Sequence, residues 1–462
     1  MNGTNWKRVE AFALDSPADN YGFSTRLADE NDWSITFTKR AISEYKKFMF
    51  LAATADRMVS PSEIVDIVWH QHLIFTNSYQ DFAKVLGKRI EHIPSTHNPE
   101  ERETFEFAKK RTTQLYTEHF GEQPEDVWGH NSLAHQLQNV VGPFPKLNKQ
   151  NSSGLIFLVF SLLFYPLFLI YKPFLLKIGN PDFLLIYLGV VVVTVVLLEL
   201  WSTNKLQEYA KFLYQGGILK YLHPFELVYM QKGKFGHIIH GILDRLVEKN
   251  YIKIGSTSYK LSVQKDNQSF EDPFKQNVYD TIKRHESLHY PELLKELKQK
   301  PMFSRIVSFC DKLKENLHQT GPFLNLFRVR WIVFLFLLTP GLTRLTLGLS
   351  NGKPVTYLIL SLLVLLAYFV ASSIWFDRIL FRQSIPNLFR DKLSQKQELK
   401  RTHWNYFLYG EQALVVTMLP LITYTDKNAN KAHMVSCGTS CSGGCGGGCG
   451  GGCGGGCGGC GG

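Results

Sequence analysis

The amino-acid sequence predicts a mainly α-helical protein that crosses a membrane four times. Three observations support this fold class: four long apolar segments, helical periodicity in the polar stretches, and a Gly- and Cys-rich C-terminal run. We expect a helical domain, a membrane hairpin, a winged-helix-like α+β domain, a second membrane hairpin, a polar segment and a disordered tail. Their expected boundaries are 1–145, 154–201, 202–329, 330–376, 377–436 and 437–462.

The N-terminal region, from about residue 38 to 140, has the apolar spacing of a soluble helical domain. Ser60 is expected at an N-cap, Pro61 at the first helical position and Glu63 at the third, which together form a capping box with a favourable proline. Apolar residues then recur at helical spacing through residues 64–86. We therefore expect a helix that begins directly after Ser60.

Asp66, His70, His72 and His92 form a candidate metal cluster, because imidazole and carboxylate are common ligands. Histidines at i and i+2 of a helix point about 200° apart, so His70 and His72 are not expected to share a metal. His72 falls on the apolar stripe and is expected to be a hydrogen-bonded core histidine. Asp66 and His70 pair at i,i+4 on the other face, where they either ligate a metal with His92 or play a purely structural part.

The block around these histidines resembles the conserved block of the glycine-rich domain-containing proteins. In that family the pattern Asp-x-x-Trp-His-x-His leads to a Tyr and then to His-x-Pro. The matching residues here are Asp66, Trp69, His70, His72, Tyr79, His92 and Pro94. Family members often carry a Cys after the Tyr, but this chain has Ala83 there, so any ligand role of that Cys is absent. The resemblance implies a domain and not a reaction.

Three of the apolar segments have the composition of transmembrane helices. Residues 154–171 and 356–376 carry no charged side chain, and residues 183–201 carry only Glu199, near the end. Each approaches the roughly 20 residues that cross about 30 Å of hydrocarbon. None shows the polar face of a buried helix in a soluble protein.

The remaining apolar segment, residues 331–350, contains Pro340 and Arg344. We expect it to span the membrane as well, with a kink at Pro340. Arg344 should then reach an interface or line the interior of the bundle.

The distribution of basic residues predicts the orientation of the spans. The four long polar flanks, 140–153, 202–220, 310–330 and 377–400, together hold 15 Lys or Arg, whereas the two short connections hold 4. The positive-inside rule then places both termini and the central domain in the cytoplasm, with the protein in the cell (inner) membrane. The N-terminus lacks the apolar core of a secretory signal, so we expect it to stay in the compartment of synthesis.

The region after the second span predicts a helix–turn–helix followed by a hairpin, which is the layout of a winged helix. A helix at 224–230, a turn bracketed by Gly233 and Gly236, a helix at 237–249 and a strand pair within 251–263 make up this pattern. Amphipathic helices follow. The last of them contains Cys310, which packing explains.

DNA binding is one interpretation of this layout. The recognition-helix position offers few polar contacts, and acidic Asp244 and Glu248 lie among them. Those contacts are His237, His240, Arg245 and Lys249. The basic charge of the region is equally explained by an anionic membrane leaflet, so nucleic acid is not expected as a partner.

The arrangement also resembles a group of uncharacterised bacterial multi-pass membrane proteins. They share a Pro-x-Glu motif before a helix and a short wing, a further membrane hairpin, and a segment similar to "YFLYGEQAL" at 406–414. They also end in a Gly- or Cys/Gly-rich tail.

Seven of the eight cysteines lie in the C-terminal run, which we expect to be disordered because it buries little apolar surface. In a cytoplasm its thiols should be reduced, and thiolates favour zinc or another thiophilic metal. A flexible extension without a ligand is the alternative. The candidate ligands are Cys437, Cys441, Cys445, Cys449, Cys453, Cys457 and Cys460.

Three functions remain open from the sequence. The first is a non-enzymatic membrane scaffold with protein partners and a metal-binding or thiol-reactive tail. The second is a metal-dependent membrane enzyme that uses Asp66, His70 and His92, and the third is a membrane-tethered DNA-binding regulator. We find no phosphate-binding loop, dinucleotide fingerprint, nucleophile elbow or His-Glu-x-x-His motif, so the first function is the expected one.

Overall fold

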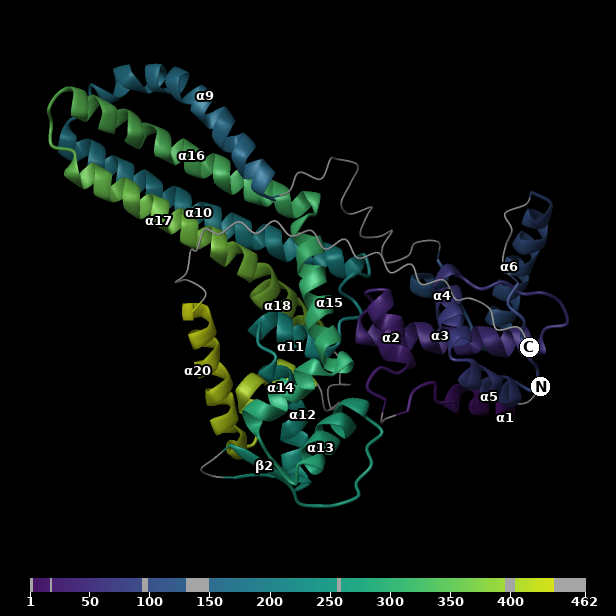
Figure 1. The fold of residues 1–462 in the computed structure, drawn as a ribbon. Helices are drawn as coiled ribbons and strands as arrows, with labels where there is room; N and C mark the ends of the chain where they lie inside the picture. The colour runs from purple at the N-terminus through teal and green to yellow at the C-terminus, as the bar shows by residue number, and fades with distance from the viewer. Residues whose placement is uncertain are drawn as a thin grey trace, which may run out of the picture.

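The computed structural model describes residues 3–16, 19–93, 99–129, 149–255, 259–394 and 404–435. It is mainly helical, as predicted, with a bundle of long apolar helices at one end and polar helical domains at the other (Figure 1). The tail cysteines, from Cys437 to Cys460, and the predicted disorder of the tail lie outside the described residues.

The N-terminal domain packs its helices around one apolar core that includes Phe48, Val68 and Phe82. Glu44 is buried in this domain and accepts hydrogen bonds from Tyr116 (2.6 Å) and from the indole N–H of Trp128 (2.9 Å). The helices are α1 (Gly3–Ala11), α2 (Phe23–Glu30), α3 (Ile35–Thr54), α4 (Glu63–Ile74), α5 (Thr76–Leu86), α6 (Pro99–Phe120) and α7 (Glu125–Trp128).

The predicted N-cap at Ser60 is wrong by two residues. Helix α4 begins at Glu63 and its N-cap is Ser62, whose hydroxyl accepts from the N–H of Val65 at 3.2 Å. The backbone of Ser60 is instead paired with the hydroxyl of Thr112 on α6, which accepts from its N–H and donates to its carbonyl, each at 2.9 Å. Ser60 therefore joins the loop to α6, and the next serine caps the helix.

Four helices among the described residues are long and apolar enough to span a membrane, which agrees with a multi-pass membrane protein. They are α9 (Lys149–Leu175), α10 (Asn180–Gln215), α16 (Gly321–Ser350) and α17 (Thr356–Ile379). α9 packs along α16, and α10 lies against α16 and α17 (Figure 1). α16 is a single helix with Pro340 inside it, and both short connections lie at the same end of the bundle.

The central domain combines helices with a small antiparallel sheet in the order β1-β2-β3. Residues Ile252 and Leu261 of the first two strands face the domain's core. Strand β3, which pairs Leu288 with Leu261, had no distinct signal in the sequence pattern. The elements are α11 (Pro224–Lys232), α12 (Gly236–Glu248), β1 (Ile252–Ile254), β2 (Lys260–Val263), α13 (Pro273–Arg284), β3 (Ser287–His289), α14 (Tyr290–Gln299) and α15 (Pro301–His318).

The segment after the last span folds back onto the central domain and shares its two hydrophobic cores. Its elements are η1 (Leu380–Ser384), α18 (Ile385–Ser394), α19 (Trp404–Tyr409), η3 (Gly410–Ala413), η4 (Val416–Met418) and α20 (Leu419–Val435). Residues 404–413 and 416–427 are together apolar enough for a further span, but they bend by 83°. Met418, Leu421 and Ile422 are buried in the domain core, so this segment packs on protein.

One buried carboxylate joins the N-terminal domain to the central domain. Glu226 accepts from the N–H of Ile35, at the start of α3, at 2.9 Å and from the N–H of His223, before α11, at 2.7 Å. Burial raises the pKa of Glu226 to about 7 despite these two bonds. The Arg305 guanidinium donates to the carbonyl of Trp33 at 2.6 Å nearby, so two helix starts and α15 meet at this contact.

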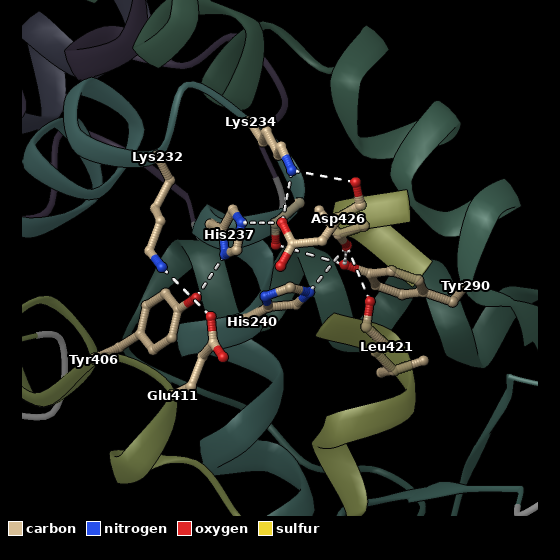
Figure 2. A network of polar contacts seen from close by, with 11 residues as sticks. Lys232, Lys234, His237, His240, Tyr290, Tyr406, Glu411, Leu421 and Asp426 are labelled. Carbon is tan, nitrogen blue, oxygen red and sulfur yellow. Dashed lines mark hydrogen bonds and ion pairs between the residues drawn. The ribbon is translucent and has the colours of Figure 1, made fainter. Parts of the chain in front are cut away.

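A polar network fastens α20 and α19 to α12 (Figure 2). The ammonium of Lys234 donates to Asp426 at 2.6 Å, and Nε2 of His237 lies 3.3 Å from the same carboxylate oxygen. The other ring nitrogen of His237 lies 2.7 Å from the hydroxyl of Tyr406. Both nitrogens of this buried histidine therefore contact the C-terminal segment.

His240 lies one turn further along α12, fully buried, with Nε2 3.2 Å from the Thr425 hydroxyl. Its Nδ1 has no hydrogen-bond partner in the described part of the chain. Burial lowers the pKa of His240 to about 3 and also lowers the pKa of His237. The folded protein therefore holds both imidazoles neutral near neutral pH.

We expect the stability of the full chain in detergent to fall as the pH drops from 6.5 to 5.5. In this pH range His240 is protonated in the unfolded chain but stays neutral in the folded protein. Its contribution to the free energy of unfolding is therefore present above pH 6.5 and is lost below it, by up to about 1.4 kcal/mol per pH unit for one such group. His240→Gln should flatten this dependence by about one proton, measured by thermal unfolding across the pH range. His285→Gln, at an exposed site, serves as the control, and equal slopes for the parent chain and His240→Gln would contradict the assignment.

Candidate metal centre

The structure brings Asp66, His70 and His92 together on the surface of the N-terminal domain. The Nε2 atoms of His70 and His92 lie 2.9 Å apart, and Nε2 of His92 lies 3.0 Å from a carboxylate oxygen of Asp66. Nε2 of His70 lies 3.6 Å from the other oxygen of Asp66. One possible ligand atom from each residue thus lies within 4.8 Å of the other two, and no other such group of three is found among the described residues.

The helix α4 supplies two of these groups through the i,i+4 spacing expected from the sequence. Asp66 and His70 share its outer face, and the side chain of His70 is 58 % exposed. His72 is fully buried on the opposite face, as predicted from the i,i+2 spacing. Helical geometry alone therefore separates the candidate ligand from the core histidine.

His72 is a hydrogen-bonded core histidine, which confirms the prediction. Its Nδ1 lies 2.8 Å from the hydroxyl of Tyr45 on α3, and its Nε2 lies 3.1 Å from the hydroxyl of Ser78 on α5. Burial lowers the pKa of His72 to about 4. A neutral imidazole can donate from one nitrogen and accept at the other, so it links three helices without a buried charge.

The third group, His92, lies in the segment after α5 and is held there by Tyr79 and Trp69. The hydroxyl of Tyr79 donates to the carbonyl of Ile90 and accepts from the indole N–H of Trp69 at 3.1 Å. The Trp69 ring meets the His92 ring edge to face, with centroids 4.6 Å apart. The Trp and Tyr of the sequence motif therefore position the histidine that follows them, whereas Pro94 lies outside the described residues.

A cavity of about 1000 Å³ opens beside the three ligand atoms, which form part of its wall. Its other walls are the loop 55–63, the segment 88–93, and Phe105 and Lys109 of α6. The sequence carried no signal for these walls, because α6 and the loop are brought together by tertiary contacts, those of Thr112 with Ser60 and of Arg111 with the carbonyl of Met58.

The donor set and its spacing fit a divalent transition metal. A tetrahedral zinc ion bound at about 2.0–2.2 Å by nitrogen and oxygen ligands separates neighbouring ligand atoms by roughly 3.3 Å. The two Nε2 atoms lie 2.9 Å apart, and each lies near a different carboxylate oxygen of Asp66, His92 at 3.0 Å and His70 at 3.6 Å, so these separations are close to that value. Three protein ligands leave one tetrahedral position, which is the arrangement of catalytic rather than structural zinc sites.

The other predicted site residues are placed differently. The tail cysteines, Cys437 to Cys460, fall outside the described residues. On α12, Asp244 accepts from the N–H of Val415 at 2.8 Å, and Arg245 pairs with Glu248 at 2.7 Å. His237, His240 and Asp244 are therefore buried against the protein itself, whereas Glu248 and Lys249 at the end of this helix are exposed.

Comparison with known proteins supports a link to the glycine-rich-domain family. Residues 24–121 match a family model described as UCP032817-like, and this range includes Asp66, His70 and His92. Glycine-rich domain-containing protein 1 of Arabidopsis thaliana is 57 % identical over 124 residues, which are 26 % of this chain and 14 % of that protein. The chain therefore spans a small part of that relative, and no solved structure matches it.

We expect Tyr79→Phe to lower the free energy of unfolding by about 1–3 kcal/mol, because the indole N–H of Trp69 and the carbonyl of Ile90 lose their shared partner. Denaturant unfolding of the full chain in detergent, followed by circular dichroism, measures this cost. Tyr409→Phe removes a hydroxyl from a side chain that is 61 % exposed and should change nothing. Equal unfolding free energies for the two variants would refute the role assigned to Tyr79.

Proposed function

We propose that this chain is a multi-pass membrane protein whose N-terminal domain binds a divalent transition metal, zinc above all, through Asp66, His70 and His92. The convergence of these three ligand atoms beside a cavity of about 1000 Å³ carries the proposal. The two histidines and the carboxylate come from two separate segments, so local helical spacing alone does not account for their meeting.

The open position favours metal-dependent chemistry over a purely structural metal. A bound zinc ion would polarise a substrate or lower the pKa of a water molecule. The protein would orient His92 through Trp69 and Tyr79, and the cavity would hold the substrate beside the ligands. The metal-dependent enzyme is therefore the first candidate, ahead of the non-enzymatic scaffold that the sequence alone favours.

The scaffold remains the second candidate because of the C-terminal cysteines. A Gly-rich segment with seven thiols has the donor chemistry for zinc or another thiophilic metal. It follows α20, which the network of Figure 2 fastens to the central domain. The tail would thus extend from a fixed point and serve as a tether or a second metal-binding segment.

DNA binding by a winged-helix-like arrangement of α11, α12, β1 and β2 has less support. His237 and His240 would be needed as contacts on α12, yet both are buried under the C-terminal segment. A nucleic acid that used these two histidines would first have to displace Tyr406 and α20 from this helix.

We place the polar domains and both termini in the cytoplasm of a cell with this protein in its inner membrane. The excess of Lys and Arg in the flanks of the spans supports this orientation. The candidate metal centre would then face the reducing cytoplasm.

Metal binding is tested on a chain that ends at Ser436, which lacks the seven tail cysteines. We expect one zinc ion per chain by elemental analysis, and Asp66→Asn, His70→Ala and His92→Ala should each weaken binding by more than about 100-fold. The loss of a direct ligand should weaken metal binding more than the loss of a residue that only hydrogen-bonds to a ligand, which lowers metal affinity by about 10–100-fold.

Matched controls for the metal experiment are His119→Ala and Asp81→Asn, which remove a histidine and an aspartate from other surfaces of the same domain. Both should bind zinc like the parent chain. A folded, metal-free chain ending at Ser436 would sink the proposal, whereas zinc bound only by the full-length chain would move the function to the tail.

The orientation is tested by thiol labelling in intact cells. In the chain ending at Ser436, the buried Cys310 is the remaining cysteine, so a single new cysteine reports its own side of the membrane. A membrane-impermeant maleimide should label Asn351→Cys in intact cells, but Lys298→Cys only after permeabilisation. The reverse pattern would place the metal centre outside the cytoplasm.

A further inference from the structure

A second cavity has a volume of about 800 Å³ and is lined by residues of the two short connections between the membrane helices. Both connections lie at the same end of the membrane bundle (Figure 1). The cavity is bounded by the two connections, 176–179 and 351–355, and by the helix ends next to them, which belong to α10, α16 and α17. The apolar spans end here, so the cavity lies where hydrocarbon meets the headgroup region. The proposed metal function does not involve it.

The cavity is lined by three cationic side chains and by no carboxylate. Lys177 and Lys353 come from the two connections, and Arg344 comes from the last turns of α16. Asp182 lies close by in the chain, at the start of α10, but does not line the cavity. The charge of the cavity wall is therefore +3, which favours an anionic ligand.

Arg344 is held in place by the backbone of the neighbouring helix end. Its guanidinium donates to the carbonyl of Leu175 and, at 2.8 Å, to the carbonyl of Ile178, and it lies 5.3 Å from the centre of the Phe183 ring. A guanidinium fixed in this way presents its charge at a defined position, as phosphate recognition requires.

The rest of the lining is apolar and continues onto the surface of the bundle. Phe183, Leu347 and Leu358 are buried at the cavity wall, whereas Leu176 is 54 % and Tyr357 is 78 % exposed at its rim. A small hydrophilic anion would leave this apolar surface uncovered. An amphiphile with an anionic head and hydrocarbon chains matches both parts.

We propose that this cavity binds the phosphate headgroup of an anionic phospholipid, with Lys177, Arg344 and Lys353 around the phosphate and the acyl chains along the outer faces of α10 and α17. Its place at the membrane interface favours a lipid over a soluble phosphate ester, because only the lipid also covers the exposed apolar rim.

The experiment uses the full chain in detergent, with native mass spectrometry and thermal unfolding as readouts. The probes are dioleoyl-phosphatidylglycerol, dioleoyl-phosphatidylcholine and glycerol 3-phosphate. We expect tighter binding of the phosphatidylglycerol. In the double variant Lys177→Gln/Lys353→Gln, the ratio of the affinities for phosphatidylglycerol and phosphatidylcholine should fall by about 25-fold. Each basic residue near an anionic surface contributes about five-fold in affinity. Both lysines are exposed, so the variant should fold.

The control variant, Lys172→Gln/Lys205→Gln, removes the same charge from residues that do not line the cavity. It should keep the preference for phosphatidylglycerol. Equal binding of the two lipids by the parent chain would overturn the proposal, as would an unchanged preference in Lys177→Gln/Lys353→Gln. Displacement of the lipid by equimolar glycerol 3-phosphate would assign the cavity to soluble phosphate esters and overturn it as well.

Discussion

The structure depends on an ion pair between Arg330 and Glu199, at the level where the apolar helices continue into the polar domains. The guanidinium donates to the two carboxylate oxygens at 3.1 and 2.7 Å, and Tyr368 donates to the same carboxylate at 2.6 Å. Arg330 is 2 % exposed and also bonds to Ser202. An unpaired charge at this depth would be costly, so the pair ties α10, α16 and α17 together at one level.

The membrane helices joined by this ion pair also contribute to the hydrophobic core of the central domain. Leu206 and Leu213 of α10, Phe323 of α16 and Phe376 of α17 belong to one hydrophobic cluster with residues of α11, α15 and α18. The central domain is thus built on helices that continue directly from the membrane. The N-terminal domain then docks on it through Glu226, which caps the contact between α3 and α11.

The two candidate sites are built in different ways. The candidate metal centre uses one exposed and two partly buried side chains of a single domain, with His92 positioned by Trp69 and Tyr79, and it lies within the range matched by the family model. The cationic cavity needs the connections of both pairs of membrane helices at once. The first is therefore contained in the N-terminal domain, whereas the second belongs to the membrane bundle.

Much of the architecture follows from local patterns in the sequence. Apolar runs of membrane-spanning length predict four apolar helices. The i,i+2 and i,i+4 spacings separate His72 from the Asp66–His70 face, because side-chain directions on a helix repeat with a fixed period. Local patterns did not predict the features that depend on contacts between distant segments of the chain. Ser60 was expected to cap α4 but is paired with Thr112 of α6 instead. The histidines of the predicted recognition helix are buried because α19 and α20 fold onto α12. The approach of His92 to Asp66 and His70 was likewise decided by tertiary packing, as was the lining of one cavity by Lys177, Arg344 and Lys353, since no local periodicity encodes the distance between separate segments.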